Sequence, residues 1–192
     1  MSEEEFEVRG VHDDAIDEAA ERGGGDPFVG RIALTTAILA TIGAVLSYEG
    51  GATQANALLY KNEAAIRKAE AANQWNFYQA KSNKLNLAEV AVLLVTRENQ
   101  PRFKAEVERY EKEKAEISKE AQKFEGESKA QDELSEHALH VHHRYALATT
   151  FLQIAIALSA IALLTRKKWL QWGVYGISLV GIVLGVSAFV IQ

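Results

Sequence analysis

The sequence contains no cysteine, and only two of its 192 residues are proline. The absence of cysteine excludes disulfide bonds, thiolate metal sites and cysteine nucleophiles. Glycine is scarce in the interior, where Gly126 is the only one between Ala52 and Trp172. A long stretch almost free of helix-breaking residues favours long helices. The sequence therefore predicts an all-α protein.

Charge is unevenly distributed along the chain. Residues 1–28 carry ten acidic and two basic side chains, a net charge of −8, whereas the whole chain has a net charge of −5. The last part of this segment contains three consecutive glycines and reads as a flexible linker. We expect residues 1–28 to form an acidic, disordered tail.

Three apolar blocks are long enough to cross a bilayer, whose hydrocarbon core of about 30 Å requires roughly 20 helical residues. They are residues 29–48, 145–164 and 169–191, and Arg31 is the only charged residue in them. An arginine near the end of a span can extend to the interface. The first block follows an acidic segment, whereas a signal peptide begins with a short basic one. We therefore expect three transmembrane helices, the first an uncleaved anchor.

The direction of insertion is predicted by the short turn at residues 165–168, which contains Arg166, Lys167 and Lys168. Basic residues in short loops remain on the cytoplasmic side of a membrane. We therefore expect this turn and the N-terminus to be cytoplasmic. The C-terminus and the segment that joins the first two spans would then both be extracytoplasmic.

Residues 49–144, between the first and second spans, are rich in strong helix formers. The segment Asn99-Gln100-Pro101 interrupts them, and proline suits the first turn of a helix. About 49 residues precede this break and about 43 follow it, giving helices of roughly 73 and 65 Å. The sequence therefore predicts an antiparallel extramembrane helical hairpin with its tip near residues 99–101.

The returning helix of this hairpin has apolar residues at heptad spacing, the signature of a coiled-coil seam. Lys114 and Ser128 interrupt the seam, which we expect to resume at Leu134 and Val141 with a three-residue offset. Ala71, Trp75, Tyr78, Leu85 and Val92 form a facing stripe on the outgoing helix, although the partner could equally belong to a second chain. The seam residues are Phe103, Val107, Tyr110, Ile117, Ala121 and Phe124.

The charged residues of this segment are balanced, with fifteen basic and sixteen acidic side chains in residues 49–144. Most are expected to form a solvated helix surface with ion pairs between successive turns. A nucleic-acid interface would require a basic surplus. Nucleic acid is therefore not an expected partner.

Four of the five histidines lie just before the second span. His137, His140 and His143 recur every three residues, and Glu133 lies one turn before His137, so two or three of these side chains could bind a zinc-like ion. The histidines could instead respond to pH. No pair has the spacing of the zinc protease motif. We favour an ordinary helix surface at a membrane interface, and we expect no cofactor.

The third span has small residues along one face, which allow helices to approach closely. Their partner could be a second copy or the small residues of the other two spans. Gln153 is expected to hydrogen-bond to a neighbouring helix, and no charged residue lies near mid-depth, where transporters usually need one. The packing residues are Ser178, Gly181, Gly185 and Ala188.

Three motifs carry a resemblance to a known family: residues 55–64, residues 73–82 (Asn-Gln-Trp-Asn-Phe-Tyr-Gln-Ala-Lys-Ser), and His142-His143-Arg144-Tyr145 entering the second span. From about Arg31 onward the chain resembles the bacterial membrane proteins grouped as domain of unknown function 4337. The resemblance implies a bacterial inner-membrane protein without an assigned activity, cofactor or catalytic residue.

The second of these motifs mixes large aromatic residues with polar ones on neighbouring helical turns. It could be a polar layer that fixes the register of the helical pair, which we favour, or a surface that recognises a partner. Its residues are Asn73, Trp75, Tyr78, Gln79 and Ser82.

Phosphate-binding loops, nucleophile elbows and paired carboxylates in an apolar setting are absent from the sequence. We therefore expect a non-enzymatic scaffold that acts through its coiled-coil hairpin and through oligomerisation. Its expected partners are the lipid bilayer and a second copy or another membrane protein. The alternatives are a metal- or pH-responsive sensor that uses the histidine cluster, and a small transport or channel subunit.

Overall fold

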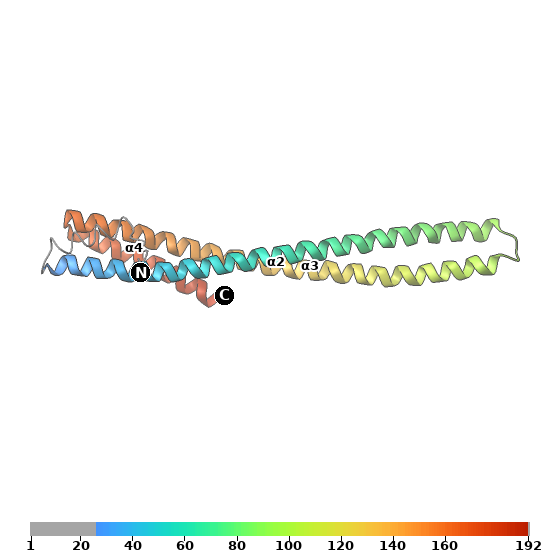
Figure 1. The fold of residues 1–192 in the computed structure, drawn as a ribbon, viewed down its shortest axis with the longest axis horizontal. Helices are drawn as coiled ribbons and strands as arrows, with labels where there is room; N and C mark the ends of the chain where they lie inside the picture. Colours follow the sequence, from blue (N-terminus) through green and yellow to red (C-terminus); the bar gives the residue numbers. More distant parts are fainter. Residues whose placement is uncertain (1–25, 192) are drawn as a thin grey trace, which may run out of the picture. The chain divides into compact units, whose positions relative to one another are not determined.

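A computed structural model describes residues 26–191, so residues 1–25 of the expected tail lie outside the described residues. The described part consists of three helices, α2 (Pro27–Leu94), α3 (Gln100–Thr165) and α4 (Lys168–Ile191), and contains no strand (Figure 1). The predicted all-α class is therefore confirmed. The chain divides into two compact units, one made by residues up to Ala55 and from Ala138 onward, the other by Asn56–His137.

Helix α2 begins two residues before the expected start of the first span. The Asp26 carboxylate accepts a hydrogen bond of 2.9 Å from the Phe28 backbone N–H, and Pro27 occupies the first helical position. An aspartate cap followed by proline is a strong helix start. The expectation that the tail extends to residue 28 is therefore wrong for its last two residues.

The connection between α2 and α3 lies at residues 95–99, earlier than the expected tip at 99–101. The outgoing helix ends at Leu94 instead of Glu98, because the Asn99 N–H donates to the Thr96 carbonyl at 3.0 Å and closes a turn there. The Gln100 side-chain amide donates to the Val92 carbonyl at 3.3 Å. This bond satisfies a carbonyl at the end of α2 that has no partner within the helix.

The first unit packs the beginning of α2, the end of α3 and the whole of α4 around an apolar core (Figure 1). Its central cluster contains Leu39 of α2, Leu152 and Ala155 of α3, and Val174 of α4. The four small residues expected to pack α4, Ser178, Gly181, Gly185 and Ala188, are all buried. They pack within the same chain.

Two glycines set how closely α4 approaches its neighbours. A Cβ atom on Gly185 would lie 2.6 Å from Leu46 Cδ1 of α2, and one on Gly181 would lie 3.1 Å from the Ala148 carbonyl oxygen of α3. Both distances are shorter than an ordinary van der Waals contact, so a side chain at either position would force a neighbouring atom to move. The neighbours that these two glycines meet are therefore Leu46 of the predicted first span and Ala148 and Leu152 of the predicted second.

The turn between α3 and α4 is shorter than expected, because α3 extends to Thr165 and α4 begins at Lys168. Arg166 has a φ of 53° in the left-handed region, and its N–H donates to the Ala162 carbonyl at 2.9 Å. This geometry ends α3 as a helix cap does. The Arg166 guanidinium also lies 3.8 Å from the Asp26 carboxylate.

Each of the three helices contains a segment long and apolar enough to cross a membrane. Buried hydroxyls in these segments donate to carbonyls of their own helix, as Thr36 does to Ile32 and Ser159 to Ala155. Gln153 is exposed and makes no hydrogen bond with another residue of 26–191. The expected bond from Gln153 to a neighbouring helix is therefore not present within the described chain.

The second unit is a pair of helical segments, residues 56–94 of α2 and 100–137 of α3, which we call the helical pair. The two segments run side by side in opposite directions (Figure 1). Ion pairs join Lys61 to Asp132 and Lys81 to Glu113, so residues further along α2 meet residues earlier in α3.

Candidate functional site

Small residues line the contact in the half of the helical pair nearer His137. Alanine recurs every seven residues on α2, and the opposing α3 positions are serine or alanine. The Ser128 hydroxyl donates to the Ala64 carbonyl and the Ser135 hydroxyl to the Ala57 carbonyl, both at 2.9 Å. A side chain as short as serine reaches a neighbouring backbone only when the helices lie close together. The buried positions are Ala57, Ala64, Ala71, Ala121 and Ser135.

These serines correct the expected course of the seam. The seam runs through Ser128 and Ser135 at unbroken heptad spacing, and Leu134 is 47% exposed whereas Ser135 is 1% exposed. The three-residue offset to Leu134 was therefore wrong. Its cause was the assumption that a polar residue interrupts the seam, whereas a hydroxyl that bonds to a carbonyl across the contact is satisfied there.

Larger side chains fill the half of the pair nearer the connection at 95–99. The six expected seam residues are all buried or half-buried. Lys114 lies among them, and its ammonium group sits 4.9 Å from the Tyr78 ring centroid. Arg109 lies 4.8 Å above Tyr110. Lys114, like Ser128, continues the seam through a specific contact, in this case a cation–π interaction.

The motif at residues 73–82 is divided between two surfaces. Trp75 packs edge-on against Tyr78 with ring centroids 5.4 Å apart, and its indole N–H donates to Glu125 of α3 at 2.8 Å. Ser82 is half-buried, whereas Asn73 and Gln79 are exposed. Trp75, Tyr78 and Ser82 thus belong to the contact with α3, and Asn73 and Gln79 do not.

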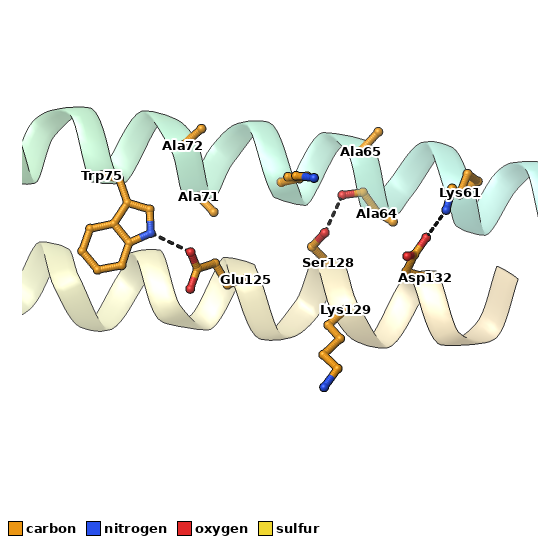
Figure 2. A pocket seen from close by; sticks show the side chains of 11 residues that line it. Lys61, Ala64, Ala65, Ala71, Ala72, Trp75, Glu125, Ser128, Lys129 and Asp132 are labelled. Carbon is orange, nitrogen blue, oxygen red and sulfur yellow. Dashed lines mark hydrogen bonds and ion pairs between the residues drawn. The ribbon is translucent and has the colours of Figure 1, made fainter. Parts of the chain in front are cut away.

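A groove of about 610 Å³ runs along one side of the helical pair (Figure 2). Four alanines form much of its lining, and the paired side chains Trp75–Glu125 and Lys61–Asp132 stand toward its two ends. The hydrogen bond with the Asp132 carboxylate raises the pKa of Lys61. The alanines are Ala64, Ala65, Ala71 and Ala72.

The face of α2 turned away from α3 carries no charge. Residues two positions after the α3-facing positions are rotated by about 200° around the helix axis. These eleven positions, together with six residues that recur every seven along the helix from Leu58 to Leu93, form what we call the uncharged face. All seventeen residues are exposed and uncharged. Its residues are Leu58, Leu59, Asn62, Ala65, Ile66, Ala69, Ala72, Asn73, Asn76, Gln79, Ala80, Asn83, Asn86, Leu87, Val90, Leu93 and Leu94.

The corresponding outer face of α3 is charged. The ten residues that lie two positions after each seam residue of α3 are all exposed, and six of them are acidic or basic. We call this set the charged face. It consists of Ala105, Arg109, Lys112, Glu116, Lys119, Lys123, Gly126, Ala130, Glu133 and His137.

The histidine cluster does not form a metal site in the described structure. Among residues 26–191, no group of three or more His, Asp or Glu side chains is arranged to hold a metal ion. Glu133, His137, His140 and His143 are all exposed. The histidine with a specific contact is His142, whose Nδ1 lies 2.7 Å from the Gly50 carbonyl oxygen. Because a carbonyl only accepts, His142 Nδ1 carries the proton.

Gly50 makes a second close contact at this point of the first unit. A Cβ atom there would lie 3.1 Å from Tyr145 Cβ. The motif His142-His143-Arg144-Tyr145 therefore meets α2 through its first and last residues. Its two central residues are exposed.

Comparison with known families matches residues 28–191 to the family described as Domain of unknown function (DUF4337). The chain belongs to this family. The predicted resemblance is thereby confirmed, and it covers nearly the whole described chain. No curated protein and no solved structure matches it.

In this member of the DUF4337 family, sequence reasoning missed the uncharged face of α2. The signal was present, because every charged residue between Asn56 and Leu94 lies outside the seventeen positions of that face. Heptad spacing predicts one apolar stripe on each helix and gives no information about charge on the opposite side. A helix surface that faces water normally carries charged residues.

Proposed function

We propose that this chain is a non-enzymatic membrane-anchored scaffold that assembles with further copies of itself through the uncharged face of α2. The observation that carries the proposal is the seventeen-residue exposed face without a charge, opposite the α3 contact. Eleven of these residues are apolar and six are amides, and a large exposed surface that is mostly apolar marks an interaction site in folded proteins. In this proposal α2 and α3 form an antiparallel coiled-coil hairpin whose α2 side binds a second copy.

Membrane anchoring is supported by the surface of the first unit. Its core is apolar, and most exposed side chains of its three apolar segments are apolar as well, which is the arrangement expected in hydrocarbon rather than in water. Only helices of sufficient length can satisfy their backbone there, and all three helices contain such a segment. The exposed residues include Leu34, Ile38, Val45, Ile154, Ile161, Leu179, Val183, Val186 and Phe189.

The orientation that we propose follows from the basic turn at Arg166, Lys167 and Lys168, which would be cytoplasmic. Trp169 and Trp172 are exposed just beyond it, at the depth where aromatic residues gather in membranes. The family resemblance implies the cytoplasmic membrane of a bacterium. The helical pair would then be extracytoplasmic.

A second copy of the chain suits the uncharged face better than an unrelated helix. Two copies anchored in one membrane with the same orientation would bring their α2 helices together in parallel. In a parallel pair each seam residue meets its own counterpart. Amides would meet amides at Asn62, Asn73, Asn76 and Asn83, and apolar residues would meet apolar residues at both ends of the seam. An antiparallel arrangement would instead place some amides against leucine or isoleucine.

The size of the face is sufficient for a specific contact. Residues 59–94 extend over about 54 Å, and a contact strip about 10 Å wide gives roughly 500 Å² on each helix. The two copies together would bury about 1,000 Å², which is the lower bound for a specific interface. Buried asparagines at such positions specify partner and register at some cost in stability.

Single-cysteine variants provide the experiment, because the natural chain contains no cysteine that could react in the background. Asn62→Cys, Asn76→Cys and Val90→Cys are each oxidised in membranes, with Lys119→Cys of the charged face as the matched control. We expect all three α2 variants to form disulfide-linked dimers, since like positions of a parallel pair lie within disulfide range. The control should remain monomeric.

Other outcomes are equally informative. Cross-linking of Asn76→Cys alone would indicate an antiparallel pair, because residues 62 and 90 of two such copies would be about 42 Å from their own counterparts. Equal cross-linking of all four variants would reflect random collision. Failure of the three α2 variants to cross-link would overturn the proposal.

A further inference from the structure

A cavity of about 530 Å³ opens at the end of the first unit, between the beginning of α2 and the beginning of α4. Its lining combines cationic, aromatic and hydrogen-bonding side chains: Arg31 from α2, and Lys168, Gln171, Trp172 and Tyr175 from α4. Asp26 also lines it. The mixture is unlike the apolar surface of the rest of this unit.

The cavity has an excess of positive charge. Neither Arg31 nor Lys168 forms an ion pair with another residue of 26–191. The opposing charge of Asp26 is engaged elsewhere, since one carboxylate oxygen accepts from the Phe28 N–H at 2.9 Å and the other lies 3.8 Å from the Arg166 guanidinium. Within residues 26–191, two cations thus face the cavity without an ion-pair partner.

The aromatic side of the cavity supplies a hydrogen-bond donor. The Gln171 amide donates to the Tyr175 hydroxyl oxygen at 2.7 Å, which leaves the hydroxyl proton of Tyr175 available to another acceptor. Trp172 packs edge-on against Tyr175 with ring centroids 6.2 Å apart and is 76% exposed. Such amphipathic rings lie at the headgroup level of a bilayer.

We propose that this cavity binds the phosphate of an anionic phospholipid headgroup. Arg31 and Lys168 provide the charge, Tyr175 donates to a phosphate oxygen, and Trp172 contacts the glycerol region. The inference rests on the proposed membrane anchoring, because the bilayer delivers the ligand. Basic cavities between membrane helices on the cytoplasmic side are suited to anionic headgroups. A lipid occupies the cavity better than free phosphate does, since its acyl chains cover the exposed apolar residues beside it.

The test uses the full-length protein in detergent micelles that contain phosphatidylglycerol or, in a second arm, phosphatidylcholine, with bound lipid counted by native mass spectrometry. We expect retention of phosphatidylglycerol only. Arg31→Gln and Lys168→Gln should each weaken this retention about fivefold, the usual contribution of one basic residue at a lipid surface. Arg31→Lys, which keeps the charge, should retain most of the binding.

The matched control is Lys167→Gln, which removes a charge from the same turn but does not line the cavity. It should leave retention within about twofold of the natural chain, a smaller change than one lost surface charge. An equal loss in Lys167→Gln, equal retention of phosphatidylcholine, or displacement of the lipid by inorganic phosphate would each overturn the proposal. Flotation of every variant with phosphatidylcholine vesicles tests the anchoring separately, so the two failures are distinguishable.

Discussion

The two helices of the helical pair share one contact but differ in their outer faces. The outer face of α3 is charged, and six of its ten exposed positions are acidic or basic. The outer face of α2 has seventeen exposed positions without a single charge. The contact between α2 and α3 is shared by both helices, so it cannot explain why their outer faces differ in charge. The comparison teaches that α3 presents a surface suited to water, whereas the outer face of α2 is the surface through which we propose a second copy binds.

A second contrast concerns small residues. In α4 they are buried against Leu46, Ala148 and Leu152 of the same chain, whereas the alanines of the uncharged face are exposed. Small residues that already have a partner need no second copy. We therefore propose that the contact between copies lies on α2 of the helical pair and not on α4.

The largest expected effect comes from placing a charge on the uncharged face. Ala80→Lys would bring two ammonium groups together in a parallel dimer, and like charges across an interface cost about 3 kcal/mol, or roughly a hundredfold in affinity. Ala130→Lys makes the same change on the charged face and should have no effect. Sedimentation equilibrium in detergent gives both dissociation constants. Equal behaviour of the two variants would remove the distinction between the faces.

An intermediate effect is expected in α4. Gly181→Leu would force a side chain toward the Ala148 carbonyl and Leu152, and overpacking of this kind costs about 1–3 kcal/mol. Gly176→Leu lies on the same helix, where an added Cβ has no neighbour within 4 Å, and should change little. Thermal unfolding followed by circular dichroism compares them. If both variants unfolded at the same temperature, α4 would pack through another face.

The smallest expected effect is on pH dependence in the helical pair. The ion pair with Lys81 lowers the pKa of Glu113, so the folded state binds a proton there less readily than the unfolded chain. The stabilisation is therefore present above the ordinary carboxyl pKa and is lost as the pH falls through the lowered value. Because the pair is partly exposed, the effect should be small. Unfolding of Glu113→Gln between pH 7 and pH 3 should show a slightly flatter dependence than that of the natural chain. A Glu113→Gln profile steeper than the natural one would contradict this sign.

Much of the fold could be predicted from sequence because its signals are local. Long helices followed from the near absence of glycine and proline, and the three membrane-compatible segments followed from uninterrupted apolar residues. Helix ends were less accurate. The Asp26 cap and the Gln100 bond to the Val92 carbonyl each moved a boundary by a few residues. The exact end of a helix depends on single side-chain hydrogen bonds, and the spacing of apolar residues gives no information about them.

The candidate site was predicted less completely, for a different reason. The seam residues were recognisable because apolar heptads are conspicuous. Lys114 and Ser128 were treated as interruptions and Ser135 was not recognised, because their place in the seam depends on partners in the opposite helix. Arg31 was expected only to extend to the interface, since its position beside Lys168 depends on a contact between distant segments.

The sequence by itself determined the helical class, the membership in the DUF4337 family and the approximate extent of each helix. These follow from composition and from patterns along one helix. Only the tertiary structure decided which side of α2 is covered by α3, and so which side remains open. It also decided that the small residues of α4 are occupied within the chain. The physical reason is that the exposure of a residue depends on which other segment packs against it. Sequence patterns show only which residues share one face of a helix.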